Sequence, residues 1–398
     1  MDAIEWVALL GLALPAYSYV GYPVLLFISA ALVQTGRDVF YLLRRGERRT
    51  RSAHTPGVSI VMAAYNEEES LGTTLERCLA VDYPPEKLEV IVGSDGSTDG
   101  TVRIARQYAE RGVRTCDFSE RRGKLSVVED CVERAEGEIV VLTDANTRLQ
   151  PDSVRKLVRH FDDPEVGAVC GELLLEGEGT GDEGIYWRYE VALKTLENRL
   201  NAVLGANGAL YAVRRELFPR LPGHLITDDF VIPMKVRERG YRVLYDPEAV
   251  AVEDPPISAK AEFRRRLRIG AGNWQALRYC AHLLAPWHGW ISLAFWSHKV
   301  LRWVTPYLLI AAFCANVFLL GSPFWRFVFA GQVGFYLLAA SGWLLPKARI
   351  PAGPLRTVTY FVLVNAALGA GLFRGLLGLQ RAAWQRTARK TAVTRGDR

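Results

Sequence analysis

The chain has 398 residues, of which 49% are hydrophobic and 23% charged, and its formal net charge is +6. This apolar content excludes a disordered or collagen-like chain, and so small a charge does not indicate nucleic-acid binding. A mean hydropathy of +0.05 is high for a soluble enzyme and low for a membrane bundle, so we expect a soluble part and a membrane part.

The first segment, residues 1–36, is predicted to be an N-terminal transmembrane helix. No charged residue occurs from Trp6 to Gly36, and a span needs only ~20 apolar residues. Pro15, Gly21 and Pro23 interrupt the run and predict a kink or a tilt. Its length and its acidic start argue against a signal peptide. The arginines that follow it, up to position 51, place the next part of the chain in the cytosol.

The late part of the chain is also apolar. Uncharged runs at 303–325, 327–346 and 357–373 predict transmembrane segments within residues 299–376, followed by a basic tail at 377–398. In the preceding segment, 263–298, the stretch from Tyr279 to His298 carries no Lys, Arg, Asp or Glu and is rich in tryptophan, and amphipathic aromatic rings favour the headgroup region. We therefore expect amphipathic or interfacial helices there.

The positive charge of the C-terminal tail conflicts with a model in which all three late apolar runs cross the membrane. Residues 374–398 carry seven Lys or Arg and one acidic residue, which predicts a cytosolic tail. Three crossings after a cytosolic domain would place it outside. Either one late segment does not cross fully, or the tryptophan-rich stretch also crosses, and the sequence leaves both open.

Residues 52–262 alternate short apolar runs with helical patterns. Strands are predicted at 58–63, 88–92 and 138–142, and helices at 67–80, 99–110 and 124–135. This alternation is typical of an α/β domain with a mostly parallel sheet and helices on both faces. Ligands of such sheets bind at the carboxyl ends of the strands.

Polar motifs follow each predicted strand. They are Ala64-Tyr65-Asn66-Glu67, Ser94-Asp95-Gly96 with its continuation to Gly100, and Thr143-Asp144-Ala145-Asn146. Turn chemistry explains any one of them, but three at one sheet edge indicate a ligand site. The oxygens of Asp144 and Asn146 suit Mg²⁺ or Mn²⁺ shared with substrate phosphates. Lys124 can offset phosphate charge, and Asp95 can accept from a nucleotide base or ribose.

Other nucleotide and metal motifs are absent from the sequence. There is no G-x-G-x-x-G, and Gly123-Lys124 lacks the remaining residues of a Walker A loop. An EF-hand that began at Asp95 would need Glu where Arg106 stands.

Two further motifs lie downstream. Thr227-Asp228-Asp229 places adjacent carboxylates before a helical pattern. Adjacent carboxylates can raise one pKa and prepare a general base, or they can simply begin a helix. An arginine cluster at 264–268 can bind a diphosphate or anionic lipid headgroups.

The order of these motifs resembles a membrane-bound family-2 glycosyltransferase, an inverting group that includes the cellulose, chitin and hyaluronan synthases. The resemblance covers about residues 55–280. It implies a GT-A fold flanked by transmembrane and interfacial helices, and transfer of a sugar from a nucleotide sugar, expected to be a UDP-sugar. It also implies a lipid or glycan acceptor, contact with membrane lipids, and a catalytic domain on the cytosolic side of the inner or plasma membrane.

The resemblance also implies roles for single residues. Asp229 would be the general base, and Mg²⁺ or Mn²⁺ would be held by Asp144 and Asn146. The donor would be bound by Ala64, Tyr65, Glu67, Asp95, Lys124, Asp144 and Arg268. The acceptor would be contacted by Asn207, Gly208, Asp228, Trp274 and Gln275.

One departure concerns the processive members of the family, which carry Gln-x-x-Arg-Trp. Here Arg265 replaces the glutamine and Ile269 the tryptophan, whereas Arg268 keeps the arginine. This departure argues against processive polymerisation. A polymer synthase that also translocates its product, a catalytically silent nucleotide-binding scaffold and a nucleotidyltransferase are the alternatives.

Overall fold

The computed structural model describes residues 2–44, 55–176, 182–254, 259–344 and 353–380. The chain divides into two compact units. The sheet unit comprises residues 34–177 and 197–257, and the helical unit comprises residues 1–33, 178–196 and 258–380. Most of the basic run that ends at position 51, and the tail beyond residue 380, lie outside the described residues.

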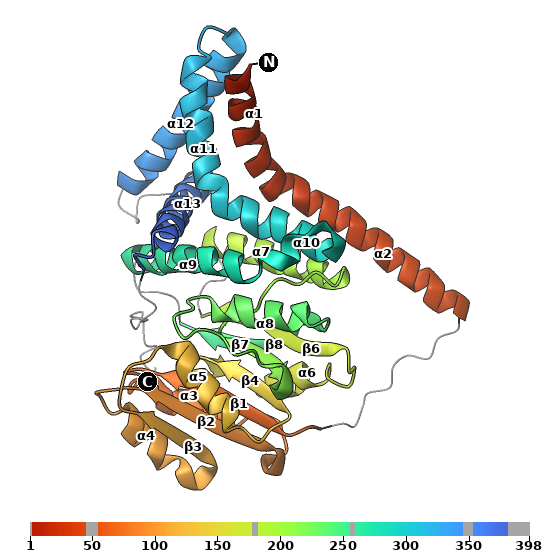
Figure 1. Ribbon diagram of the computed structural model, residues 1–398, viewed down its shortest axis with the longest axis vertical. Coiled ribbons are helices and arrows are strands. Elements are labelled where there is room, and N and C mark those ends of the chain that lie inside the picture. Colours follow the sequence, from red (N-terminus) through yellow and green to blue (C-terminus); the bar gives the residue numbers. More distant parts are fainter. Residues whose placement is uncertain (1, 45–54, 177–181, 255–258, 345–352, 381–398) are drawn as a thin grey trace, which may run out of the picture. The chain divides into compact units, whose positions relative to one another are not determined.

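An eight-stranded sheet forms the centre of the sheet unit, in the order β3-β2-β1-β4-β7-β6-β8-β5 (Figure 1). Its strands are β1 (Val58–Ala64), β2 (Leu88–Asp95), β3 (Val113–Phe118), β4 (Ile139–Thr143), β5 (Arg148–Leu149), β6 (Val166–Leu175), β7 (Leu210–Arg214) and β8 (Arg242–Glu253). Strands β3, β2, β1 and β4 run parallel, as do β6 and β8, whereas β7 is antiparallel to both of its neighbours. The prediction of a mostly parallel α/β sheet is confirmed.

Helices connect these strands, and their bounds refine the sequence prediction. They are α3 (Leu71–Leu79), α4 (Thr101–Gln107), α5 (Lys124–Glu133), α6 (Ser153–Val158) and α8 (Asp228–Glu238). The predicted helix at 67–80 is wrong at its start, where Asn66 has a left-handed φ of 54°. The Glu67 N–H donates to Thr101 Oγ1 at 2.8 Å, so this segment turns before α3 begins.

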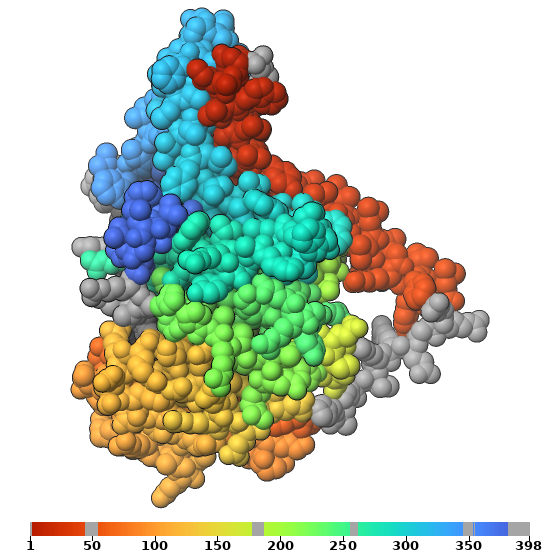
Figure 2. All heavy atoms as spheres, in the orientation of Figure 1, coloured from red at the N-terminus to blue at the C-terminus, as the bar shows by residue number. Residues whose placement is uncertain are grey.

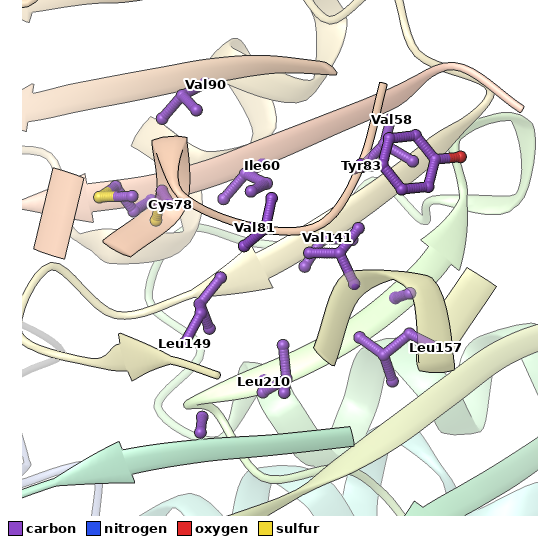
Figure 3. Close-up of a cluster of buried hydrophobic side chains, with 14 of the residues drawn as sticks. Val58, Ile60, Cys78, Val81, Tyr83, Val90, Val141, Leu149, Leu157 and Leu210 are labelled. Carbon is purple, nitrogen blue, oxygen red and sulfur yellow. The ribbon is translucent and has the colours of Figure 1, made fainter. Parts of the chain in front are cut away.

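A buried apolar cluster holds the strands and helices together (Figure 3). Its strand residues include Val58, Ile60, Val90 and Val141, all at most 1% exposed. Full burial of such a side chain contributes about 1.5–3 kcal/mol. The core therefore fixes β1, β2 and β4 side by side, which sets the positions of their carboxyl ends.

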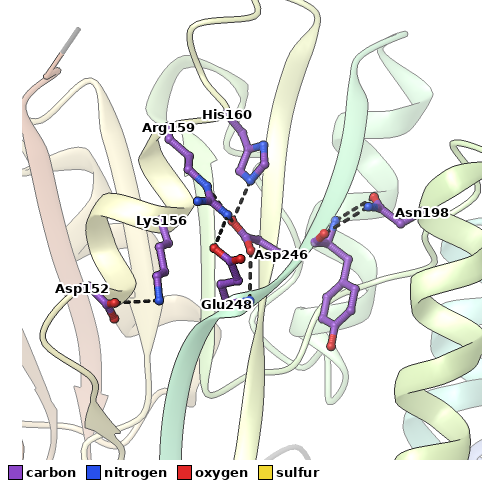
Figure 4. A network of polar contacts seen from close by, with 8 residues as sticks. Asp152, Lys156, Arg159, His160, Asn198, Asp246 and Glu248 are labelled. Atoms are coloured by element: carbon purple, nitrogen blue, oxygen red, sulfur yellow. Dashed lines mark hydrogen bonds and ion pairs between the residues drawn. The ribbon is translucent and has the colours of Figure 1, made fainter. Parts of the chain in front are cut away.

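A charged network stabilises the sheet unit around the Asp246 carboxylate (Figure 4). Asp246 is buried, and its Oδ2 lies 2.7 Å from both Arg159 Nη2 and His160 Nε2. Burial by itself raises the pKa of Asp246, but the His160 hydrogen bond and the nearby positive charge hold the pKa below its ordinary value. We interpret this network as structural.

The helical unit contains α1 (Ala3–Ala16), α9 (Ala259–Tyr279), α10 (Trp290–Ala294), α11 (Leu301–Phe318), α12 (Pro323–Leu344) and α13 (Pro354–Leu376). A π-helical turn joins α1 to α2 (Tyr22–Arg44), and another joins α10 to α11. Helix α7 (Asp182–Arg199) belongs to this unit as far as Leu196. In the described residues, Ala3–Leu43, Trp290–Phe318, Pro323–Leu344 and Leu355–Leu376 are long and apolar enough to cross a membrane.

Glycine allows the first of these helices to approach α11 closely. A Cβ atom on Gly11 would lie 2.7 Å from the Leu308 carbonyl oxygen and 2.8 Å from the Ala312 Cβ. Ala8 and Ala315 are buried in the same contact. Figure 2 shows the start of the chain, in red, against the pale blue of α11 and α12.

A second charged network lies within the helical unit, around Glu190 of α7. Glu190 Oε2 lies 2.9 Å from His298 Nε2, and its other oxygen accepts from Arg302, which also donates to the Tyr189 hydroxyl at 2.8 Å. Burial raises the pKa of Glu190, but the neighbouring His298 and Arg302 hold it well below its ordinary value. The network ties α7 to the π-helical turn before α11, through His298, and to the first turn of α11, through Arg302.

Candidate active site

The three polar motifs meet at one edge of the sheet. Ala64 ends β1, Asp95 ends β2 and Thr143 ends β4. Because β2, β1 and β4 are parallel neighbours, their carboxyl ends lie together. The predicted donor residues of all three motifs therefore share one site in the sheet unit.

The Asp95 carboxylate is fully buried and holds the loop that precedes α5. Its Oδ1 accepts from the Arg122 N–H at 2.6 Å, and Oδ2 accepts from the Gly123 N–H at 3.1 Å. Gly123 has a φ of 96°, a conformation that side-chain-bearing residues rarely adopt. Asp95 therefore positions Lys124, the first residue of α5.

The first motif lies beside an arginine that the sequence analysis missed. The Arg121 guanidinium stacks on the Tyr65 ring, 3.7 Å from its centroid. The Glu67 carboxylate accepts from the Ser70 hydroxyl at 2.6 Å. Arg121 lies within a run of charged residues before Gly123, but no spacing rule in the sequence pairs it with an aromatic ring.

Lys124 is surrounded by carboxylates. Its Nζ lies 2.6 Å from Asp144 Oδ1 and 4.0 Å from Asp228 Oδ2. Burial lowers the pKa of Lys124, but the charges of Asp144, Asp228 and Asp229 outweigh burial and raise the pKa above its ordinary value. The ammonium group stays charged at physiological pH.

The predicted general base lies at the start of α8. Thr227 is the N-cap, and Asp228 and Asp229 follow it in the first turn. Burial and the Asp228 charge raise the pKa of Asp229, Lys124 opposes the rise, and the resulting pKa is about 6. A carboxyl group with this pKa can take up a proton near neutral pH. The two interpretations of this motif, helix start and proton acceptor, are compatible.

The predicted acceptor loop lies against Asp229. The Ala206 N–H donates to the Asp229 carbonyl oxygen at 2.9 Å, and Gly205, with φ 70°, packs on Phe230. A Cβ atom on Gly208 would lie 3.4 Å from Asp229 Oδ2. Asn207 Nδ2 donates to the Gly171 carbonyl at 3.4 Å. The absence of a side chain at Gly208 leaves one side of the Asp229 carboxyl group uncovered by this loop.

Tyr211 is a second site residue that the sequence analysis missed. It is 2% exposed, and burial together with the charges of Asp228, Asp229 and Asp144 raises its pKa well above the ordinary value. Its place follows from the antiparallel pairing of β7 with β4, which sets Tyr211 opposite Leu142. No sequence pattern indicated that pairing.

The remaining predicted residues lie elsewhere in the chain. Arg268, Trp274 and Gln275 belong to α9 of the helical unit, so their roles toward donor and acceptor stay predictions. In the same helix, Glu262 accepts from Arg265 at 2.8 Å and from Arg266 at 2.6 Å. Burial raises the Glu262 pKa, but these arginines lower it to about 2.

Comparison with known proteins bears on the family and the fold of the chain. Residues 59–220 match the model of glycosyl transferase family 2. Poly-beta-1,6-N-acetyl-D-glucosamine synthase of Staphylococcus aureus (strain COL) is 28% identical over 231 residues, which are 56% of this chain and 55% of that protein. The Staphylococcus epidermidis synthase is 24% identical over 230 residues, with the same coverage. The chain thus spans about half the length of these curated relatives.

A solved structure supports the fold over nearly the whole chain. The mannosyltransferase of Pyrobaculum calidifontis, in complex with GDP-Man and Mn²⁺, has a TM-score of 0.70 and 24% sequence identity, and the match covers 95% of this chain and 100% of that one. Residues 59–220 therefore form a domain that matches the family-2 glycosyltransferases, and the likeness to the solved structure shows the GT-A fold.

Proposed function

We propose that the protein is a membrane-associated inverting glycosyltransferase. It transfers a sugar from a nucleotide-sugar donor to a lipid or glycan acceptor, with its catalytic domain in the cytosol. The observation that carries the proposal is the pairing of two groups in one site. Asp229 has a pKa raised to about 6 and lies beside Gly208, while the charged Lys124 lies 2.6 Å from Asp144.

These groups supply what the reaction needs. The acceptor hydroxyl gives its proton to Asp229, and its oxygen bonds to the anomeric carbon as the bond from that carbon to the diphosphate breaks. Lys124 stabilises the negative charge that grows on the leaving diphosphate, which is usually a large catalytic contribution. Inversion needs no covalent enzyme nucleophile, so we assign none.

The oxygen ligands after β4 fit a divalent cation that shares its coordination with the donor. Asp144 offers a carboxylate and Asn146 an amide oxygen, and Mg²⁺ is commonly bound by one or two carboxylates plus substrate phosphates. Within the described residues, no group of three or more His, Cys, Asp or Glu can hold a metal. Bound Mg²⁺ or Mn²⁺ would add positive charge at the diphosphate.

The donor is proposed to be a UDP-sugar. The staphylococcal relatives are named as synthases of an N-acetylglucosamine polymer, which makes UDP-N-acetylglucosamine the first donor to test. GDP-mannose is the second, because the mannosyltransferase solved with GDP-Man matches 95% of this chain. Ile269, where processive members carry tryptophan, favours single transfer over polymerisation.

The test is nucleotide release by the full chain in lipid nanodiscs. UDP-N-acetylglucosamine, UDP-glucose and GDP-mannose are each offered with Mn²⁺, with Mg²⁺ and with EDTA, together with a lipid extract as the acceptor. We expect release from one donor, loss of release in EDTA, and a product heavier by one sugar. A ladder of masses would instead support the polymer synthase. Nucleotide binding without release from any donor would support the silent scaffold.

Arg268→Ala distinguishes the two interpretations of the arginine cluster. If Arg268 binds the donor diphosphate, the variant should bind UDP more weakly, because a charge-assisted bidentate contact is lost. If the cluster binds lipid headgroups, UDP affinity should stay unchanged while binding to anionic vesicles falls. Arg278→Ala, which changes an exposed arginine of the same helix outside the cluster, is the matched control.

A further inference from the structure

Helix α13 packs differently from the other apolar helices, although Leu355–Leu376 is long enough to cross a membrane. We describe the position of α13 relative to α11 and α12, which form an antiparallel pair. Asn316 Nδ2 donates to Gln332 Oε1 at 2.8 Å, and the rings of Phe313 and Phe329 stack with centroids 5.2 Å apart. The two helices therefore run antiparallel near the tip of this hairpin, and we call the start of α11 and the end of α12 its base.

Both halves of α13 contact that base. Near its start, Thr359 Oγ1 donates to the Ala339 carbonyl of α12 at 3.3 Å. Further on, the Gly369 carbonyl accepts from the Tyr307 hydroxyl of α11 at 2.7 Å, and a Cβ on Gly369 would lie 2.9 Å from Pro306. A helix crossing beside α12 would instead bring its second half to the tip of the hairpin.

Helix α13 also packs closely against α9. A Cβ on Gly371 would meet the Leu267 carbonyl oxygen at 2.1 Å, and a Cβ on Gly375 would meet that of Ala271 at 2.6 Å. Both partners advance by the same four residues, so the two helices point in the same direction where they meet. Helix α9 carries six basic residues and one acidic residue, a composition that excludes it from the hydrocarbon core. The part of α13 from Leu368 to Gly375, which packs on α9, therefore lies at the same depth as α9.

Exposed aromatic residues support an interfacial position for the base of the hairpin. Trp287, Trp290 and Trp296, which precede α11, are 77%, 38% and 47% exposed. Tryptophan rings favour the headgroup level of a membrane.

We propose that α13 does not cross the membrane but lies in the plane of its surface together with α9. The crossings are then the N-terminal helix, α11 and α12. Since no crossing separates the sheet unit from α9 along the chain, α13 and the tail lie on the side of the sheet unit. This topology removes the conflict between the basic tail and the number of apolar runs, and it does not depend on the proposed catalytic activity.

Cysteine labelling tests the side on which α13 ends. Cys314 is exposed and the other five cysteines are buried, so Cys314→Ser gives the background for single cysteines. Glu110→Cys reports the sheet unit, Gly321→Cys the hairpin tip, and Leu379→Cys the end of α13, all at exposed positions. A membrane-impermeant maleimide is applied to intact cells and to inverted vesicles.

We expect Leu379→Cys to label in the same preparation as Glu110→Cys, and Gly321→Cys to label in the other. Labelling of Leu379→Cys together with Gly321→Cys would overturn the proposal. The test asks only which positions are labelled in the same preparation, so it is valid whichever side of the membrane the sheet unit occupies.

Depth measurements by nitroxide power saturation test the orientation of α13 directly. Ala366, Ala370, Phe373 and Leu377 form an exposed stripe on α13, and Phe327, Gly331, Gly334 and Leu338 form an exposed stripe of identical spacing on α12. Each position is labelled in turn. The α13 stripe should lie at one depth, whereas the α12 stripe should span about 16 Å at 1.5 Å per residue. An equal gradient on both stripes would overturn the proposal.

Discussion

The two units each contain a charged network, and the balance of charge differs between them. In the sheet unit, Lys124 faces the carboxylates of Asp144 and Asp228, with Asp229 beside them. In the helical unit, Glu190 is surrounded by His298, Lys299 and Arg302. Negative charge exceeds positive charge in the first network, and the reverse holds in the second.

This difference separates a reactive network from a structural one. In the first network, burial raises the pKa of Asp229, and the excess of carboxylates over cations adds to the rise, so that the pKa reaches about 6. Where a carboxylate is matched by cations, as Glu190 is, its pKa falls well below the ordinary value and the group holds no proton to exchange. A carboxyl group whose pKa is shifted toward neutral pH, as that of Asp229 is, is the candidate general base.

The largest expected effect is on turnover in Asp229→Asn. The amide cannot accept the acceptor proton, so we expect turnover to fall about 10³-fold, within the range for a lost general base. Donor affinity, measured by calorimetry, should be retained. Glu76→Gln, which removes an exposed ion pair with Arg111, is the control and should match the wild type. Wild-type turnover in Asp229→Asn would show that the network is not catalytic.

Next in size is the loss of stability in Glu190→Gln. Removing this carboxylate leaves buried Arg302 without its charge partner, and breaking such a pair costs about 3 kcal/mol. Thermal unfolding followed by tryptophan fluorescence should shift down, while turnover per folded molecule stays unchanged. The double variant Glu190→Gln/Arg302→Gln should recover part of the loss. A turnover defect as large as that of Asp229→Asn would contradict the distinction between the networks.

Lys124→Met should reduce turnover about 10²-fold, because one group that stabilises charge on the leaving diphosphate is lost. The same change removes the charge that lowers the pKa of Asp229. The midpoint of the pH–rate profile should therefore move above the wild-type value. Lower turnover with an unmoved midpoint would show that Lys124 does not act on Asp229.

The smallest effect is on the pH dependence of stability, and its sign differs between the networks. Asp229 has a raised folded pKa, so its contribution is present below about pH 4, its unfolded pKa, and is lost as pH rises through about 6. Glu190 has a lowered folded pKa, so its contribution is lost as pH falls below about 4.

Melting curves of Asp229→Asn and wild type, measured from pH 4 to pH 7.5, check the first of these signs. The variant should gain stability relative to the wild type as pH rises. The wild-type rate should fall tenfold for each pH unit below about 6. A constant difference between the melting curves would mean that Asp229 does not titrate in this range.

The sequence predicted the parts of the fold that short-range patterns determine. β1, β2 and β4 are buried apolar runs that end in turn-forming polar residues, and that pattern located Asp95 and Asp144 at one sheet edge. The start of α3 was misplaced because the hydrogen bond from Glu67 to Thr101 joins residues far apart in the chain. Tyr211 and Arg121 were missed for the same reason, since antiparallel pairing and ring stacking leave no local signal.

In the helical unit, amino-acid composition alone does not tell which apolar segments cross the membrane. The apolar run at 357–373 has the hydropathy of a span, and the contacts of α13 through Thr359, Gly369 and Gly371 distinguish it from α11 and α12. The conflict of charges in the sequence indicated that one segment differs, but not which one.

The bare backbone at Gly208 has a consequence for experimental control of the enzyme. An alanine methyl group there would meet Asp229 Oδ2 at ordinary van der Waals distance, so the fold has room for it. The methyl group would cover the proposed base without altering any charge. Gly208→Ala should therefore block the acceptor from reaching Asp229 while the donor stays bound. The variant would allow the complex that precedes transfer to be captured.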